Sequence, residues 1–175
     1  MRGEFTPLFL PIIIPKKQER RAKEMKVISI IGEKKSGKTT LIEYLIANLK
    51  EHGNVGCIKH AHELDLNATR DTTRFVTAGA AVVIGTSEDR TVTISGPKNL
   101  AELIDEMARS GIDFLLVEGF KGSDLPKITL SDFSTRDVSG ILKRVDLSGN
   151  SASQELIREI VHLILSLEDY QPSTA

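Results

Sequence analysis

The chain has 175 residues, of which 40% are hydrophobic and 27% are charged, a composition typical of one soluble globular domain. Its net charge of −1 excludes the strongly basic surface that nucleic-acid and membrane-surface proteins use. No apolar run is long enough to cross a bilayer, so we expect a cytoplasmic protein without nucleic-acid or membrane partners.

Residues 1–25 form an unusual amino-terminal segment. An apolar stretch broken by Pro7, Pro11 and Pro15 is followed by basic residues from Lys16 onward. Prolines oppose a helix, and basic residues that follow an apolar run have the wrong order for a signal peptide. We expect 1–25 to be a disordered tail or an extension from an upstream start. We expect 26–170 to form a single domain and 171–175 a flexible terminus.

The first predicted unit is a strand, a glycine-bounded loop and a helix. The apolar run Lys26–Ile31 is typical of a short buried strand, and Thr39–Lys50 carries apolar residues at helical spacing. Between them, residues 32–39 have the sequence Gly-Glu-Lys-Lys-Ser-Gly-Lys-Thr. This matches G-x-x-x-x-G-K-[ST], the phosphate-binding loop (P-loop), in the strand–loop–helix setting that such a loop requires.

The residue types of the P-loop explain its chemistry. Gly32 and Gly37 can adopt backbone angles closed to other residues and let the main chain approach a ligand closely. Loop N–H groups and the first helical turn then face the phosphates. Lys38 would reach the β- and γ-phosphates, and the Thr39 hydroxyl would hold Mg²⁺ as cofactor. The predicted nucleotide-binding residues are Gly32, Lys34, Lys35, Ser36, Gly37, Lys38, Thr39 and Thr40.

Strands and helices alternate along the rest of the chain. Strands are predicted at 54–60, 80–84, 90–94, 114–117, 127–130 and 142–145, and helices at 72–78, at 97–109 and from Ser151 onward. Gln154 would complete a capping box with Ser151. Cys57, the single cysteine, falls in a predicted buried strand and is expected to be an inert core thiol. The pattern predicts an α/β fold, a mostly parallel sheet flanked by helices of the P-loop NTPase class, with its ligand beyond the carboxyl ends of the strands.

An acidic residue ends the most apolar predicted strand. Glu118 follows Phe114–Val117, and a carboxylate in this position is typical of the metal-side acid of P-loop proteins. Mg²⁺ usually keeps several waters, so the carboxylate can act directly or through water. We predict Lys38 and Glu118 as the catalytic residues, and Thr39 and Glu118 as Mg²⁺ ligands. The alternative is a carboxylate that is merely exposed at a strand end.

A polar segment after the second strand lies where a loop that senses metal and γ-phosphate would lie. His60 and His62 have the spacing of residues on one face of a strand, and with nearby acids they could bind a transition metal. We favour hydrogen bonds to the ligand or to neighbouring loops. Asp65 or Asp71 could reach Mg²⁺ through water, and Arg74 could contact phosphate.

Basic residues in the last third leave two interpretations open. Lys121 and Lys127 flank a predicted turn after Glu118, where they could contact an anionic substrate or simply belong to a solvated loop. A small-molecule or nucleotide kinase would need arginines in a closing lid, for which Arg136 and Arg144 are weak candidates. A regulatory NTPase is a third possibility.

Five segments of the chain, in this order, are similar to one known family: 32–41, 58–62, 71–74 followed by 78–80, 116–121 and 126–128. Together they resemble MobB, the adaptor protein of molybdopterin-guanine dinucleotide biosynthesis, over about residues 25–128. The resemblance implies a GTP-binding protein with weak Mg²⁺-dependent GTPase activity. Its partner would be molybdopterin or the guanylyltransferase that joins GMP to molybdopterin, and it would form a homodimer. By motif match, Gly37, Lys38 and Thr39 would bind phosphate and Mg²⁺, and Glu118 would be the acid of the second motif.

The sequence departs from this family's pattern at three places. Glu63 stands where a second histidine is common, residues 67–70 form a shorter loop, and Thr129 follows the Pro-Lys-Ile segment. All three lie outside the P-loop, so they concern the sensing loop and the partner surface. The guanine-reading motif [NT]-K-x-D is absent, so the choice of GTP over ATP rests on the resemblance alone.

Overall fold

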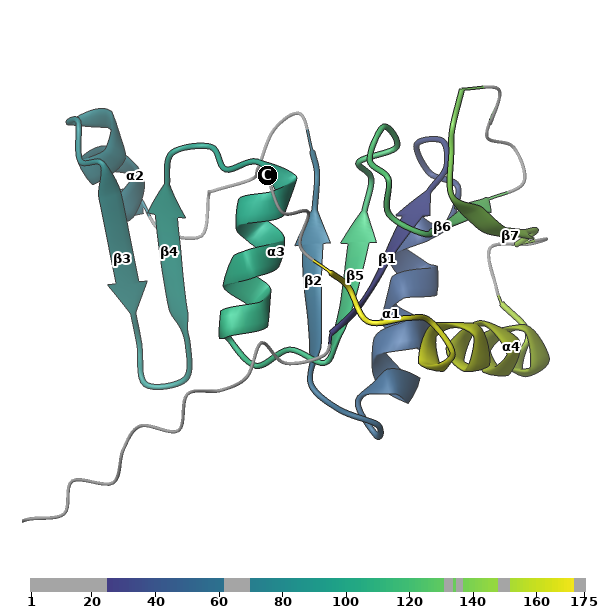
Figure 1. Ribbon diagram of the computed structural model, residues 1–175. Helices are drawn as coiled ribbons and strands as arrows, with labels where there is room; N and C mark the ends of the chain where they lie inside the picture. The colour runs from purple at the N-terminus through teal and green to yellow at the C-terminus, as the bar shows by residue number, and fades with distance from the viewer. Residues whose placement is uncertain (1–24, 62–69, 131–133, 135–136, 148–151, 172–175) are drawn as a thin grey trace, which may run out of the picture.

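The computed structural model describes residues 25–61, 70–130, 134, 137–147 and 152–171. They form a five-stranded parallel sheet flanked by helices and a separate two-stranded antiparallel hairpin (Figure 1). The predicted mostly parallel sheet with flanking helices is therefore confirmed. In chain order the elements are β1 (Lys26–Ile31), α1 (Lys38–Leu49), β2 (Val55–Lys59), α2 (Arg70–Thr77), β3 (Val82–Thr86), β4 (Thr91–Ser95), α3 (Leu100–Arg109), β5 (Phe114–Glu118), β6 (Lys127–Leu130), β7 (Ile141–Val145) and α4 (Gln154–Leu165).

The parallel sheet has the strand order β2-β5-β1-β6-β7. The two strands that carry the sequence motifs, β1 and β5, are neighbours in register, with Ile30 opposite Glu118. All four residues Phe114–Val117 are buried, because a parallel strand covered on both faces needs apolar side chains on both. The P-loop and Glu118 therefore emerge side by side at one edge of the sheet.

Two hydrophobic clusters cover opposite faces of this sheet. On one face α1 and α4 pack over alternate strand residues such as Ile28, Leu116 and Ile128. On the other face α3 packs over Val27, Leu115 and their neighbours. Burial of alternate side chains on each face follows from the two-residue period of a strand. Of the described helices, none is long and apolar enough to span a membrane.

The hairpin β3–β4 stands apart from the parallel sheet. Its strands were predicted at 80–84 and 90–94, and in the structure they pair with each other from Val82↔Ser95 to Thr86↔Thr91. The connection closes with a hydrogen bond from the Ser87 N–H to the Arg90 carbonyl (2.9 Å). A turn this short joins antiparallel neighbours, whereas a parallel pair needs a longer crossover. α2 packs against β3, and in Figure 1 α3 lies between this unit and β2.

Several local predictions need correction. The last helix begins at Gln154 with Ser153 as its N-cap, whose Oγ accepts from the Leu156 N–H (3.2 Å); the start proposed at Ser151, outside the described residues, is wrong. Cys57 is exposed, because on β2 the buried positions alternate with exposed ones. Met25, assigned to the tail, is 1% exposed in the core.

Candidate nucleotide-binding site

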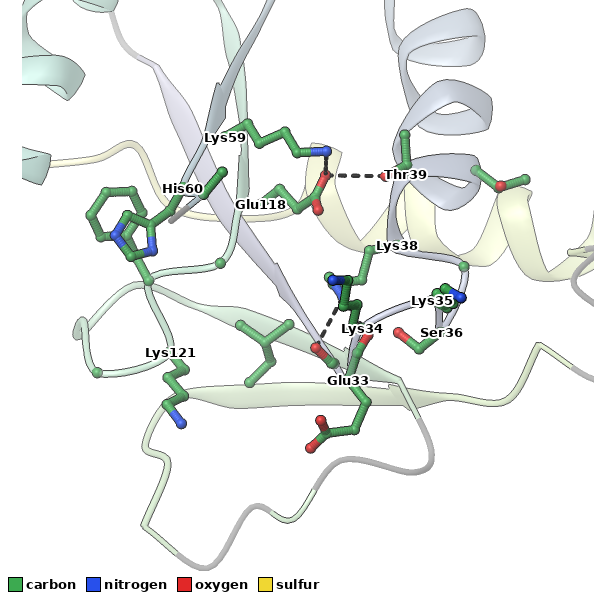
Figure 2. A pocket seen from close by; sticks show the side chains of 18 residues that line it. Glu33, Lys34, Lys35, Ser36, Lys38, Thr39, Lys59, His60, Glu118 and Lys121 are labelled. Carbon is green, nitrogen blue, oxygen red and sulfur yellow. Dashed lines mark hydrogen bonds and ion pairs between the residues drawn. The ribbon is translucent and has the colours of Figure 1, made fainter. Parts of the chain in front are cut away.

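A cleft of about 1330 Å³ lies at the carboxyl ends of β1, β5 and β2. Three segments line it: the P-loop with the start of α1 (31–40), the end of β2 (59–61) and the turn after β5 (118–122). Figure 2 shows their side chains from close by. Five lysines and two glutamates are among the lining residues, which makes the cleft suitable for an anion.

Of the two glycines singled out in residues 32–39, Gly37 has a left-handed backbone and Gly32 does not. Gly37 has φ 90° and serves as the N-cap of α1 without a side-chain cap, so the N–H groups of the first turn stay available to a ligand. Lys35 also has a positive φ of 66°, which is uncommon for a residue with a side chain. A Cβ on Gly32 would lie 2.8 Å from the Ser36 Oγ and 3.0 Å from the Leu130 Cβ, so a larger residue there would force these neighbours to shift.

Two polar groups of the P-loop fit a phosphate ligand. The Lys38 Nζ donates to the main-chain carbonyls of Gly32 (3.0 Å) and Glu33 (2.5 Å), which folds the ammonium over its own loop. Among the described residues, the buried Ser36 Oγ has no hydrogen-bond partner. A buried hydroxyl without a partner is costly, and a phosphate oxygen would satisfy it.

Glu118 and Thr39 bring two hard oxygen ligands together. The Thr39 Oγ1 lies 3.3 Å from the Glu118 Oε2, and both point into the cleft in Figure 2. The Glu118 main chain is fixed, since its carbonyl accepts from the His60 N–H (3.0 Å) and the next N–H, of Gly119, donates to Ile30 (3.1 Å). One carboxylate and one hydroxyl fit Mg²⁺, which takes its remaining ligands from phosphate and water.

The described residues do not support a transition-metal site. They contain no group of three or more His, Cys, Asp or Glu side chains that could hold a metal ion. The His60 ring packs on the Phe120 ring instead, with centroids 4.6 Å apart. His62 and Asp65 lie outside the described residues.

The structure separates two predicted sensing residues from the cleft. Asp71 and Arg74 lie on α2, form an ion pair of 3.7 Å with each other, and are both 82% exposed. In Figure 1, α2 is on the far side of α3 from the P-loop. Of the predicted sensing set, His60 and Lys121 do line the cleft.

Lys127 has neither of the roles that its sequence position suggested. Its side chain is completely buried, and its Nζ donates to the carbonyls of Leu125 (2.9 Å) and Ser123. Burial lowers the pKa of this amine, and the nearby Asp124 carboxylate partly opposes the change. Lys127 therefore holds the connection between β5 and β6 in place, and does not contact a ligand.

Lys59 and Phe120 are among the lining residues that sequence reasoning did not predict. The Lys59 Nζ lies 3.4 Å from the Glu118 Oε2, and Phe120 has a positive φ of 53°. Lys59 could have been found from its position, because it is the last residue of a strand whose carboxyl end lies at the ligand edge. Phe120 could not, because its apolar side chain gave no indication of a site.

Comparisons with known proteins agree on one family. The family model "Molybdopterin guanine dinucleotide synthesis protein B" (MobB) matches residues 27–144. A molybdopterin-guanine dinucleotide biosynthesis adapter protein of Haemophilus influenzae is 36% identical over 114 residues, 61% of this chain and 64% of that protein. A relative from Methanocaldococcus jannaschii is 34% identical over 61% of this chain and 47% of its own length. The aligned region thus spans between about half and two thirds of these curated relatives.

Solved structures show the same fold. The crystal structure of Bacillus subtilis MobB has a TM-score of 0.62 and 25% identity, and the match covers 84% of this chain and 100% of that one. A MobB homologue from Bacillus stearothermophilus also gives a TM-score of 0.62, at 21% identity and with 82% of this chain covered. Because the family model covers more than half of its residues, the chain belongs to the MobB family.

Proposed function

We propose that this chain is a Mg²⁺-dependent GTP-binding adaptor with weak GTPase activity that assists the guanylyltransferase of molybdopterin-guanine dinucleotide synthesis. The observation that carries the proposal is the P-loop beside the Thr39–Glu118 oxygen pair in a protein of the MobB family. The loop amides and Lys38 would bind the β- and γ-phosphates, and Thr39 and Glu118 would hold Mg²⁺. When bound, the metal would neutralise charge on the phosphates.

Slow hydrolysis follows from the contents of the cleft. Apart from lysines, the charged or titratable side chains lining its described part are Glu33, His60 and Glu118. His60 is packed on Phe120, and Glu118 is engaged by Lys59 and Thr39. In the Mg²⁺-bound site Glu118 would be a metal ligand, and Glu33 is an exposed loop residue, so we expect the site to favour binding over turnover.

A binding comparison tests the choice of nucleotide. The choice of GTP rests on family membership, since no described residue is assigned to the base. Calorimetric titration of the full chain with GTP, ATP and molybdopterin, each with Mg²⁺, is expected to show GTP bound more tightly than ATP. Equal affinity for GTP and ATP would contradict guanine specificity and leave the phosphate site intact.

Lys38→Ala is expected to weaken triphosphate binding by about 10- to 100-fold, because it removes charge-assisted hydrogen bonds of about 1.5–3 kcal/mol in total. Lys50→Ala is the matched control, because it removes the same charge from the other end of the same helix, where Lys50 is the C-cap. Affinity would be measured by calorimetry and folding by circular dichroism. Equal affinity in the two variants would contradict the assignment of the site.

The proposed homodimer would use the open face of the hairpin. Val82 is 56% and Ile84 is 64% exposed, and as alternate residues of β3 they lie on the same face. An isolated two-stranded hairpin is marginally stable in water, so covering this face with a second copy would stabilise it. Sedimentation of the wild type and of Ile84→Lys tests this. A monomeric wild type at high concentration would exclude the dimer and leave the face to the guanylyltransferase.

One observation favours the alternative of a kinase. The cleft volume of about 1330 Å³ exceeds the roughly 300–1000 Å³ of most small-ligand sites, so a phosphate acceptor could fit beside a nucleotide. The arginines considered for a lid do not support it: Arg136 lies outside the described residues, and Arg144 is on β7, away from the lining segments. Transfer of labelled γ-phosphate to an added acceptor would support the kinase.

A further inference from the structure

Lys59 and Thr39 both approach the same oxygen atom of Glu118. The Lys59 Nζ is 3.4 Å and the Thr39 Oγ1 is 3.3 Å from the Glu118 Oε2, as the dashed lines of Figure 2 show. The Lys59 side chain is 56% exposed, and that of Glu118 is 14% exposed. The shielded carboxylate therefore has its counter-charge on the solvent side.

The main chain holds Lys59 in this place. Lys59 is the last residue of β2 and stands directly opposite Glu118 in the register of β2 and β5. Residues opposite each other on neighbouring strands have their side chains on the same face. The ammonium of Lys38 is hydrogen-bonded to carbonyls of its own loop. Of Lys38 and Lys59, it is therefore Lys59 that neutralises Glu118.

A magnesium ion and the Lys59 ammonium cannot both occupy this position. An ion held by Thr39 and Glu118 would lie within a few ångströms of the Nζ, and like charges at that distance repel strongly. The lysine is the group that can move, because it is more than half exposed and has a flexible four-carbon stem. Exposed ion pairs of this kind are weak, so a divalent cation would displace it readily.

We propose that Lys59 substitutes for the metal cation while Mg²⁺ is absent: its ammonium neutralises Glu118, so that a polyphosphate can enter the cleft. Mg²⁺ then displaces the Lys59 ammonium from Glu118. We call this the stand-in role of Lys59. This rests on the proposed nucleotide site and adds an order of events to it. Without Lys59, an uncompensated carboxylate would face the incoming phosphates and repel them until the metal arrived. Lys59 therefore reduces the dependence of anion binding on Mg²⁺.

The test measures anion affinity with and without metal. The probes are GTP and inorganic tripolyphosphate, titrated calorimetrically into the full chain in EDTA and in saturating Mg²⁺. Lys59→Met, which keeps the length and removes the charge, is expected to weaken binding about three- to tenfold in EDTA, the scale of one partly shielded ion pair. In saturating Mg²⁺ it is expected to bind like the wild type. Lys59→Arg, which keeps the charge, should resemble the wild type in both conditions.

Two further variants separate the possible outcomes. Lys50→Met removes the same charge away from the cleft and should change neither condition. In Glu118→Gln, adding Lys59→Met should no longer penalise binding in EDTA, because no carboxylate is left to neutralise. A Lys59→Met loss that is equal in EDTA and in Mg²⁺ would overturn the proposal and make Lys59 a direct phosphate ligand. If Lys59→Met lost no affinity in either condition, the proposal would also be overturned, and the Lys59–Glu118 contact would be an incidental ion pair.

These results are distinguishable from failure of the nucleotide site itself. If Lys38→Ala also keeps full affinity for GTP and tripolyphosphate, the P-loop assignment fails and Lys59 has nothing to assist. If Lys38→Ala loses affinity while Lys59→Met behaves like the wild type in EDTA, the nucleotide site stands and only the stand-in role is rejected.

Discussion

The parallel sheet and the α2–β3–β4 unit both contain strands rich in apolar residues, but these residues are buried in the sheet and partly exposed in the hairpin. In the sheet, β1 and β5 are mostly apolar, and nearly all of their residues are buried. In the hairpin, Val83 is buried, but its neighbours Val82 and Ile84 are largely exposed. Both regions therefore satisfy strand propensity, and they differ in what covers them. The covered region carries the candidate site, whereas the open region exposes apolar side chains.

The largest expected effect comes from truncating one apolar side chain to alanine in each of the two regions. Leu116→Ala removes a side chain that is 1% exposed and is expected to cost about 2–5 kcal/mol of unfolding free energy, because it leaves a cavity in a packed core. Ile84→Ala, at a site 64% exposed, is expected to cost less than about 0.5 kcal/mol in the monomer. Urea unfolding at low protein concentration measures both. Equal losses would show that the hairpin face is already covered in the monomer.

An intermediate effect is expected where the two regions join. Asn99 follows the hairpin and caps α3: its side chain accepts from the Glu102 N–H (2.9 Å), and the Glu102 carboxylate accepts from the Asn99 N–H (2.7 Å). Asn99→Ala should cost about 1 kcal/mol, the usual value of an N-cap, and Asn99→Ser should restore most of it. Urea unfolding at matched concentration tests this. An Asn99→Ser variant as unstable as Asn99→Ala would argue against capping.

The smallest expected effect probes the edge of the covered region. Cys57 is exposed on the edge strand β2, yet surrounding protein atoms and then the Glu118 charge raise its pKa. A raised pKa leaves less reactive thiolate at neutral pH, so a disulfide reagent should label Cys57 more slowly than a free thiol. The rate should increase with pH. Glu118→Gln, which lowers this pKa, should speed labelling a few-fold.

The urea-unfolded protein is the control for that rate. If the native chain were labelled no faster than a fully buried cysteine, Cys57 would be covered in solution. If it were labelled as fast as the unfolded chain, the pKa would not be raised.

The sequence was sufficient to predict the elements whose local residue pattern also matches their place in the folded sheet. The β1–P-loop–α1 unit and the strand ending at Glu118 are local motifs, so their bounds and their common edge followed from spacing and from the rules of parallel sheets. The exposure of Cys57 and the burial of Lys127 did not follow, because they depend on the strand order, which places β2 at the edge of the sheet and β6 between β1 and β7. A lysine beside a turn is ordinarily solvated, and here carbonyls from its own loop make burial tolerable.

The connection between β5 and β6 is fastened to β1 at both of its ends. It comprises residues 119–126 and has no helix, and both ends are bonded to β1, through Gly119 to Ile30 and through Pro126 to Ser29. Because Glu118 precedes this connection and is held in register by β1, an inserted residue there would leave the acid in place. It would instead reshape the cleft wall formed by residues 119–122, so the length of this connection should tune what fits beside the phosphates.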